Sequence, residues 1–303
     1  MAQNVARCIK EDFPGAIIVG VDARSRHAGS FFVDRFIEIE SADSDNYLRV
    51  IQSILARNEI DFFIPLNESE LRSLLSVSKT KLDEVLGYSK IIWSGRKSLE
   101  LFLDKTSTTE YLRKIGVRVP NTFSLPDTNT LEYPLIIKPS KSSGSKGVMV
   151  VKNQKELNAA LVFVPDPVIQ EYIPSPDSEF TAAVFSRKGQ ESRVLVFKRI
   201  LSSSGDTSWC ESIYDEEIAK ICETIANEIK LDGSINVQLR KFENRSYVFE
   251  VNPRFSSTVY IRSQLGFKDV LWSIDDTVDY LSFDSFSSRN QIYAVYQFSR
   301  KIE

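Results

Sequence analysis

The chain has 303 residues, of which 42% are hydrophobic and 26% are charged, and its formal net charge is −3. This length allows about two domains with a well-buried core, and the slightly acidic balance excludes a global electrostatic attraction to nucleic acid or an anionic membrane. No apolar run of about 18 residues predicts a transmembrane helix, and the N-terminal residues MAQNVARCIKEDF lack the apolar core of a signal peptide. We therefore expect a cytoplasmic protein without nucleic-acid or membrane partners.

Cysteine and histidine are too sparse for many kinds of metal and nucleophile chemistry. Cys8, Cys210 and Cys222 are far apart and form no CxxC pair, so they are expected to be reduced thiols. The single histidine, His27, excludes His-rich zinc sites and weakens the case for a Ser-His-Asp triad. The chemistry must therefore use carboxylates, lysines, arginines or a metal bound by oxygen.

Residues 1–97 have the pattern of an α/β domain. Buried-strand patterns occur at 16–22, 61–65 and 90–95, and residues 46–60 place apolar side chains on one helical face. This alternation predicts a parallel sheet, in which ligands bind at the carboxyl ends of the strands. Polar residues that stand at such ends are either ligand contacts or loop caps: Asp22, Asn67, Glu68 and Glu70.

The start of this domain departs from the usual pattern. A doubly wound domain normally begins with a strand and a Gly-rich turn before its first helix. Here the sequence opens directly on the helix-like residues 3–13, QNVARCIKEDF. We therefore expect a truncated Rossmann-like domain whose first strand is missing.

Residues 98–173 predict a smaller α+β unit. A helix beginning near residue 104 is closed by Gly116 and followed by a turn at Pro120. Strand patterns at 134–138 and 147–151 enclose a polar segment, a short helix follows Asn153, and a further strand covers 166–173.

Residues 174–303 predict antiparallel strands and one long helix. Strands at 179–186 and 192–201 are joined around Gly189, and strands at 233–242 and 245–255 are joined by the turn ENR. Between these pairs lies a helix whose apolar face is formed by Ile218, Ile221, Cys222, Ile225 and Ile229.

The polar segment KPSKSSGSKG, residues 138–147, is longer and more basic than a tight turn requires. Backbone N–H groups in a loop rich in glycine and serine can approach phosphate oxygens closely, while serine and lysine side chains add donors and charge. No GxxxxGK[ST] motif occurs in the segment. It is typical either of a flexible phosphate cover or of an ordinary mobile hairpin.

The segment FEVNPRF, residues 249–255, carries a second polar pattern. Glu250 and Asn252 are two apart on a predicted strand and share one face, while Phe249 and Val251 are expected on the other. A carboxylate and an amide oxygen side by side are hard ligands that suit Mg²⁺. The pattern indicates either a metal site or a polar stripe on the surface.

Two further residues extend this pattern. Gln238 lies on the preceding strand, where a hairpin can bring it alongside Glu250. Arg254 continues the same face and would place a cation beside the metal and phosphates.

Six segments occur in an order that resembles the ATP-grasp superfamily, in the branch similar to the synthetase halves of carbamoyl-phosphate synthase. They are DK at 104–105, PLIIKPSKSSGSKGV at 134–148, VIQEYI at 168–173, SEFTAAV at 178–184, NVQ at 236–238 and FEVNPRFSST at 249–258. The resemblance covers nearly the whole chain. It implies a pre-ATP-grasp α/β domain at 1–97, a small ATP-grasp lobe at 98–173 and a C-terminal lobe with the metal site at 174–303.

The resemblance also implies roles for individual residues. ATP would be held by Lys105, Lys138, Ser142, Ser143, Gly144, Ser145, Glu171, Tyr172, Ile173, Glu179 and Arg199. In this set the lysines contact phosphates, the loop covers them, residues 171–173 form the adenine hinge, and Glu179 holds the ribose. Mg²⁺ or Mn²⁺ would be held by Gln238, Glu250 and Asn252. The catalytic residues would be Lys138 and Arg254, with the arginine stabilising the transferred phosphoryl group or an acyl phosphate.

The activity that the resemblance implies is ATP-dependent ligation of a small-molecule carboxylate to an amine. ATP would convert the carboxylate to an acyl phosphate, and the amine would then displace phosphate to give an amide. Two alternatives remain open: phosphorylation of a small acid, as by a carbamoyl-phosphate synthase, and a regulatory protein that binds ATP without turnover. A homodimer is one assembly to be considered. The loop departs from the family pattern at Ser142 and Ser143, where more glycine is usual.

Overall fold

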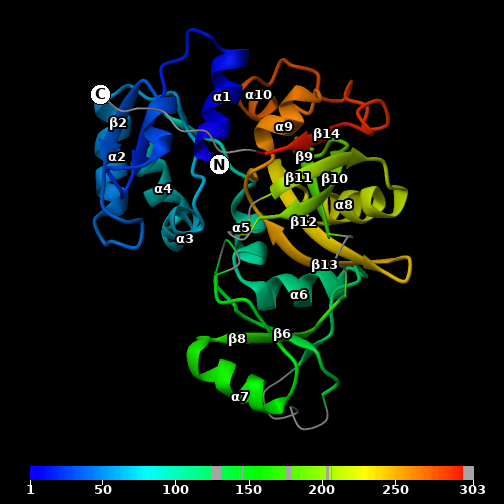
Figure 1. The fold of residues 1–303 in the computed structure, drawn as a ribbon. Helices are drawn as coiled ribbons and strands as arrows, with labels where there is room; N and C mark the ends of the chain where they lie inside the picture. The colour runs from blue at the N-terminus through cyan, green and yellow to red at the C-terminus, as the bar shows by residue number, and fades with distance from the viewer. Residues whose placement is uncertain are drawn as a thin grey trace.

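The computed structural model describes residues 1–123, 131–142, 144, 146–174, 179–202, 205 and 207–295. Ser143 and Ser145, which are expected in the phosphate cover, lie outside these residues. The N-terminal region, a large twisted sheet and a smaller sheet occupy three corners of the molecule, and α6 (Lys105–Lys114) lies between the two sheets (Figure 1).

The N-terminal region alternates helices and short strands, as expected. Its helices are α1 (Ala2–Asp12), the 3₁₀ turn η1 (Ala28–Phe32), α2 (Tyr47–Arg57), α3 (Glu68–Ser76), α4 (Lys79–Leu86) and α5 (Arg96–Phe102). Its strands are β1 (Val19–Asp22), β2 (Arg35–Glu38), β3 (Phe62–Phe63) and β4 (Lys90–Ile91). Among the described residues these strands form two separate parallel pairs, β1–β2 and β3–β4, and not one continuous sheet.

One prediction for this region was wrong. Residues 16–22 were expected to form a fully buried strand, but β1 begins at Val19, its side chains are all half-buried, and Ile17 is 80% exposed. The reason is that β1 pairs with β2 alone among the described strands, so it lies at the edge of a sheet and not within one. Val21, Phe63 and Ile91 nevertheless pack into one core beneath α2 and α4, which joins the two strand pairs.

The large sheet is antiparallel and has the order β13–β12–β9–β10–β11–β14. Its strands are β9 (Glu179–Ser186), β10 (Arg193–Leu201), β11 (Thr207–Ile213), β12 (Gly233–Phe242), β13 (Arg245–Asn252) and β14 (Ile292–Ala294). The predicted helix is α8 (Glu216–Ile229), and it buries Ile218, Cys222 and Ile225 against this sheet. The other face packs on Phe267, Trp272 and Tyr280, close to α9 (Val259–Gln264) and α10 (Asp269–Ile274).

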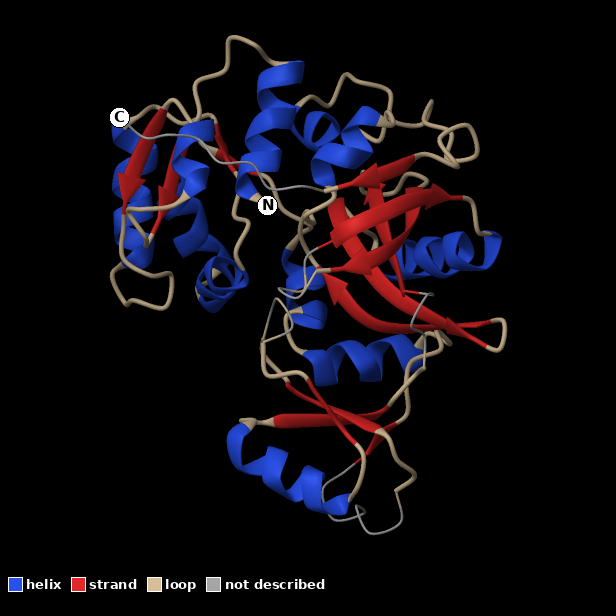
Figure 2. Ribbon diagram, viewed as in Figure 1, coloured by secondary structure: helices blue, strands red, loops and turns tan. Residues whose placement is uncertain are grey.

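The small sheet is also antiparallel, in the order β5–β8–β6–β7. Its strands are β5 (Thr122–Phe123), β6 (Leu135–Pro139), β7 (Met149–Val151) and β8 (Pro167–Glu171). The helix α7 (Gln154–Phe163) covers one face, and the side chain of its predicted cap Asn153 accepts a hydrogen bond from the Glu156 N–H at 3.0 Å. This lobe stands apart from the rest of the molecule, below α6 (Figure 2).

The N-terminal region is fixed directly to the strands of the large sheet. Gly233 opens β12 at φ +118°, and a Cβ there would lie 2.3 Å from the Trp93 carbonyl oxygen, so the close approach requires glycine. The Ser94 hydroxyl donates to the Pro253 carbonyl at 2.9 Å. On the other side, Cys8 of α1 shares a core with Val259 of α9. These contacts bring the start of α3 to the end of β13.

Two further observations bear on the predictions from composition. None of the helices within the described ranges has the length and apolar character needed to cross a membrane. Cys8, Cys210 and Cys222 are free thiols and are buried, as their spacing suggested.

Candidate active site

A cavity of about 350 Å³ lies where the small sheet faces the large sheet, and it gathers most of the predicted residues. The predicted residues in its wall are Lys105, Lys138, Ser142, Gly144, Glu171, Ile173, Glu179, Arg199, Gln238, Glu250, Asn252 and Arg254. Of the predicted residues that the structure describes, Tyr172 alone is not in the wall. Residues separated by up to 149 positions in the chain, such as Lys105 and Arg254, therefore meet in one place.

The predicted metal ligands lie together on the β12–β13 hairpin. The strands pair so that Gln238 is opposite Glu250, and Asn236 is opposite Asn252. Because alternate residues of a strand share a face, these four side chains point the same way, and all four line the cavity. The turn at Glu243 and Asn244, both at positive φ, pairs Phe242 with Arg245, and a register shift between Leu239 and Gln238 then brings Gln238 opposite Glu250.

Asn236 is a site residue that the sequence analysis missed. Its amide nitrogen donates to the Thr181 hydroxyl at 2.7 Å and to the Ala182 carbonyl at 3.1 Å. Its amide oxygen accepts from Gln238 at 3.4 Å and is therefore turned toward the predicted ligands. The available signal was its position two residues before Gln238 on the same strand.

Phe249 was placed on the wrong face. The hairpin register shifts between Gln238 and Leu239: Glu250 is opposite Gln238, but Val248 is opposite Leu239. Phe249 is thus the extra residue of a β-bulge, and a bulge re-aims the side chain that it carries. The Phe249 ring consequently lines the cavity, while Val251 joins the core as expected.

Lys138 reaches the cavity from β6 and is only 6% exposed. Its ammonium group donates to the Phe249 carbonyl at 3.2 Å and lies 6.0 Å from the centroid of that ring. Burial lowers the pKa of Lys138 to about 8; Glu250 opposes this effect, while Lys105 and Arg240 add to it. The charged form of a buried ammonium group of this kind would be stabilised by an anion bound beside it.

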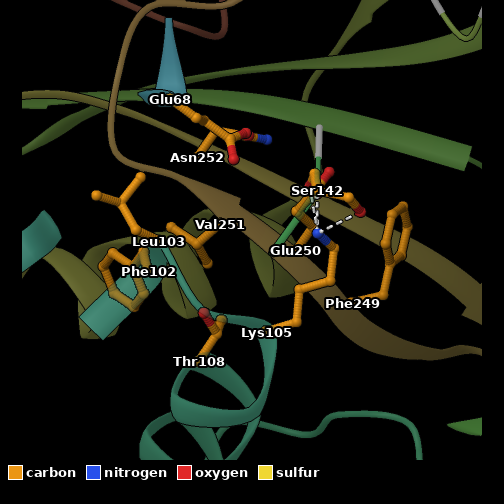
Figure 3. A pocket seen from close by; sticks show the side chains of 10 residues that line it. All are labelled: Glu68, Phe102, Leu103, Lys105, Thr108, Ser142, Phe249, Glu250, Val251 and Asn252. Atoms are coloured by element: carbon orange, nitrogen blue, oxygen red, sulfur yellow. Dashed lines mark hydrogen bonds and ion pairs between the residues drawn. The ribbon is translucent and has the colours of Figure 1, made fainter. Parts of the chain in front are cut away.

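Lys105 connects the basic loop to the metal strand. It is the first residue of α6, whose N-terminus is capped by Asp104. Its ammonium group donates to the Ser142 carbonyl and hydroxyl and lies 3.8 Å from a Glu250 carboxylate oxygen. Figure 3 shows Lys105 between Ser142 and Glu250, beside a small hollow of about 10 Å³ that Glu68 and Asn252 also line.

Arg199 and Glu179 are coupled to each other and to a predicted ligand. One Arg199 nitrogen donates to Glu179 at 2.8 Å and to the Gln238 amide oxygen at 2.9 Å. The second Glu179 oxygen accepts from Arg240 at 2.9 Å. The carboxylate predicted to hold the ribose is therefore already bracketed by two guanidinium groups.

The cavity has the donors and charge that a polyphosphate needs. Among the described residues, five cationic side chains line it: Lys105, Lys138, Arg199, Arg240 and Arg254. The Nε–H groups of Arg199 and Arg254 are buried and have no hydrogen-bond partner within the described chain. Because an unpaired buried donor is costly, these two groups indicate an anionic ligand that is to be bound.

The predicted metal ligands also fit the expected ion. Glu250 supplies a carboxylate and Gln238 and Asn252 supply amide oxygens, whereas no group of three His, Cys, Asp or Glu residues in the described ranges could hold a metal. An oxygen set with a single carboxylate suits Mg²⁺, which keeps several waters and binds phosphate oxygens. It does not suit zinc.

The four polar residues at strand ends in the N-terminal region divide into two groups. Asn67 and Glu70 form a capping box at the start of α3, and Asp22 accepts a bond from the Arg24 N–H, so these three are caps. Glu68 instead points to the site (Figure 3): it is 8% exposed and lies 3.6 Å from Arg254 and 3.3 Å from Arg72. Burial raises the pKa of the Glu68 carboxyl group.

The lowered pKa of Lys138 predicts a proton uptake that accompanies nucleotide binding. Above pH 8 the free protein holds Lys138 largely neutral, and phosphates placed beside it would raise its pKa and return the proton. We expect ATP binding to take up close to one proton at pH 9 and almost none at pH 6.5, and the affinity to fall as the pH rises through 8. Titration calorimetry in two buffers of different ionisation enthalpy measures this, and equal proton uptake at both pH values would contradict it.

Comparison with known proteins adds independent findings. The family model described as an ATP-grasp domain matches residues 102–258. The D-alanine–D-alanine ligase of Fusobacterium nucleatum is 24% identical over 242 residues, covering 73% of this chain and 82% of that protein. The carbamoyl phosphate synthase large chain of Clostridium beijerinckii is 25% identical over 246 residues, covering 68% of this chain but 22% of its own length.

A solved structure shares the fold. The biotin carboxylase domain of the Hydrogenobacter thermophilus 2-oxoglutarate carboxylase, solved with MgADP, ADP and bicarbonate, superposes with a TM-score of 0.75 at 17% identity. The match covers 95% of this chain and 70% of that one. It therefore includes the N-terminal region as well as both sheets.

Proposed function

Since this chain belongs to the ATP-grasp family of ADP-forming ligases, whose cofactors are ATP and Mg²⁺, we propose that it joins a small-molecule carboxylate to an amine. One observation carries the proposal: a single cavity combines Lys138 and Lys105, the Glu250–Asn252 pair and Arg254. Phosphate contacts, metal ligands and a cation for the reacting carboxylate are the parts that carboxylate activation requires.

The nucleotide end of the cavity belongs to the small lobe and the hinge. Residues 171–173 would contact the base, and Lys138 and Lys105 would hold the phosphates, with Ser142 and Gly144 from the loop beside them. Gln238, Glu250 and Asn252 would hold Mg²⁺, which supplies charge neutralisation when bound. The chain's own contribution is to align the terminal phosphate with the substrate and to keep water away from it.

The substrate end lies near Arg254 and Glu68. In the first step a carboxylate oxygen attacks the terminal phosphorus, the bond to the bridging oxygen breaks, and ADP and an acyl phosphate form. In the second step the amine nitrogen attacks the acyl carbon, and inorganic phosphate leaves with the bonding electron pair. We assign to Arg254 the task of holding the carboxylate and then the acyl phosphate, because its buried Nε–H is unpaired among the described residues.

Glu68 is suited to the amine side of the reaction. It is held 3.6 Å from Arg254, and burial raises its pKa, so it accepts a proton more readily than an exposed glutamate does. The domain division proposed from the sequence, with a Rossmann-like region at 1–97 and lobes at 98–173 and 174–303, places the substrate between the first and third parts.

An assay of ADP release with hydroxylamine as a trap tests this function. Purified protein is mixed with ATP, Mg²⁺ and a panel of amino acids and small carboxylates, with and without amines. We expect one carboxylate to support ADP release and to give a hydroxamate, which reports an acyl phosphate, and an amine to replace hydroxylamine.

The same assay separates the alternatives. ADP release with bicarbonate as the acid, and with no other carboxylate, would favour the synthase-type reaction of the Clostridium relative. Tight ATP binding without ADP release across the whole panel would favour a regulatory protein and would overturn the ligase proposal.

A further inference from the structure

Arg240 lies at the meeting point of three parts of the nucleotide cavity, although no sequence motif pointed to it. It belongs to β12, two residues after the predicted ligand Gln238, and its side chain is largely buried against the cavity. Its guanidinium group has five N–H donors in a rigid plane, so it can hold several acceptors in fixed relative positions.

The first acceptor is in the hinge. Arg240 Nη1 donates to the Ile173 carbonyl at 3.1 Å. Ile173 lies two residues beyond the end of β8 in the small sheet, and the next residue, Pro174, has no N–H. The Ile173 carbonyl thus gives the large sheet a direct hydrogen bond to this connection.

The second acceptor is Glu179. Arg240 Nη2 and Nε donate to one oxygen of this carboxylate at 2.9 and 3.3 Å, while Arg199 holds the other oxygen at 2.8 Å. The same guanidinium group thus bridges the hinge carbonyl and the carboxylate that faces the cavity.

Two aromatic rings restrict the guanidinium group further. The Arg240 Cζ atom lies 5.7 Å from the ring centroid of Tyr172 and 5.7 Å from that of Phe249. Tyr172 belongs to the hinge, and Phe249 is the bulge residue that turns into the cavity. A cation between two rings at this distance is attracted to both faces.

We propose that Arg240 is a positioning residue for nucleotide selectivity, a role that rests on the proposed function. By fixing the Ile173 carbonyl and the Glu179 carboxylate together, it holds the hinge backbone and the ribose end of the cavity in one geometry. A backbone hinge distinguishes bases through the pattern of its N–H and C=O groups, so its discrimination depends on how rigidly those groups are held. Arg240 therefore sets the preference for an adenine nucleotide over a guanine nucleotide.

The experiment compares Arg240→Ala and Arg240→Lys with the matched control Lys241→Ala. Lys241 is the next residue on β12, and it pairs with Asp215 and Glu217 outside the cavity. Calorimetry measures the dissociation constants of ATP and GTP, and thermal melting reports the fold. The control variant should bind both nucleotides as the unaltered protein does.

We expect Arg240→Ala to weaken ATP binding by about tenfold, because the Ile173 carbonyl and the Glu179 carboxylate are no longer held in place before the nucleotide binds and must be ordered on binding. GTP binding should change little, so the ratio of the two constants falls toward one. Arg240→Lys should give an intermediate ratio, because a single ammonium group can pair with Glu179 but cannot also hold the Ile173 carbonyl.

Two outcomes would count against the inference. An ATP-to-GTP ratio that is unchanged in folded Arg240→Ala overturns it, whether neither nucleotide loses affinity or both lose it equally; an equal loss shows that Arg240 contributes charge and not selectivity. Where Arg240→Ala does not fold, an unchanged ratio in Arg240→Lys overturns it. Failure of the unaltered protein to bind ATP would instead overturn the proposed function.

Discussion

Replacing Glu250 with glutamine is expected to lower the rate of turnover by a hundredfold or more while leaving the fold and most of the nucleotide affinity intact. The substitution keeps the shape of the side chain and removes its negative charge. Glu250 is the one carboxylate among the three predicted metal ligands, and it lies 3.8 Å from Lys105, so its charge also offsets a nearby cation. Removing one preorganised group that stabilises developing charge in a transition state, such as an oxyanion-hole donor, costs roughly 10²- to 10³-fold in rate, and we expect a comparable effect here.

Nucleotide binding should depend much less on Glu250, since Lys105, Lys138 and the hinge lie on other elements. Steady-state rates, titrated over a range of Mg²⁺ concentrations, are compared with the dissociation constant of ATP. Glu243→Gln is the matched control, because this exposed residue forms the tip of the same hairpin, far from the cavity wall. Near-normal turnover of Glu250→Gln at limiting Mg²⁺ would show that this hairpin is not the metal site.

Regular periodicity made much of the fold predictable. The α8 face with Ile218, Cys222 and Ile225 and the β12–β13 hairpin both appear where apolar spacing and turn residues place them. The pairing of the N-terminal strands was not predictable, because periodicity identifies a strand but not its neighbours. Strands as short as Phe62–Phe63 and Lys90–Ile91 have too few residues to reveal whether they are central or at an edge.

The candidate site was predictable where its residues share a short segment. Glu250 and Asn252 could be placed on one face from their spacing alone, and the hairpin indicated that Gln238 could lie alongside them, although its pairing with Glu250 depends on the bulge. Phe249 was misplaced because a bulge breaks strict alternation, and nothing in FEVNPRF signals where the extra residue falls.

Residues that reach the site through tertiary contacts were harder to recognise. Arg240 and Asn236 lie on a strand whose pattern reads as ordinary alternation, and their roles depend on Ile173 and Thr181, far away in sequence. Glu68 could be suspected at a strand end but not distinguished from its capping neighbours Asn67 and Glu70. Only the packing of the N-terminal region on β13 separates them.

Lys138 links the site to stability, because a buried cation that is placed to bind a ligand lowers the free energy of unfolding of the nucleotide-free protein. Its pKa falls from 10.5 in an unfolded chain to about 8 in the fold, mainly through burial. The unfolded state therefore binds the extra proton between pH 8 and pH 10.5, and the free energy of unfolding rises with pH across that window. Below pH 8 the charged Lys138 lowers the free energy of unfolding by its full amount, about 3 kcal/mol at 1.4 kcal/mol for each pKa unit.

We therefore expect Lys138→Met to change stability and binding in opposite directions. Without nucleotide at pH 7, the free energy of unfolding of the variant should exceed that of the unaltered protein by about 1 to 3 kcal/mol. The reason is that methionine fills similar space without a buried charge. The difference should shrink as the pH rises from 8 to above 10. ATP affinity at pH 7 should fall by about tenfold or more, since a charge-assisted phosphate contact is lost, and the proton uptake at pH 9 should disappear with it.

Denaturant unfolding at several pH values, together with calorimetry, measures both effects, and Lys152→Met is the control. Lys152 is exposed in the same lobe, just after β7, so its replacement should alter neither quantity. A Lys138→Met protein that binds ATP normally would remove Lys138 from the phosphate site. One that loses ATP but gains no stability at pH 7 would show that the ammonium group is not strained in the empty cavity. A gain in stability with a loss of ATP binding is the result that burial of Lys138 beside Phe249 requires, because the cost of the desolvation that depresses its pKa is offset by the negative charge of the phosphate when it binds.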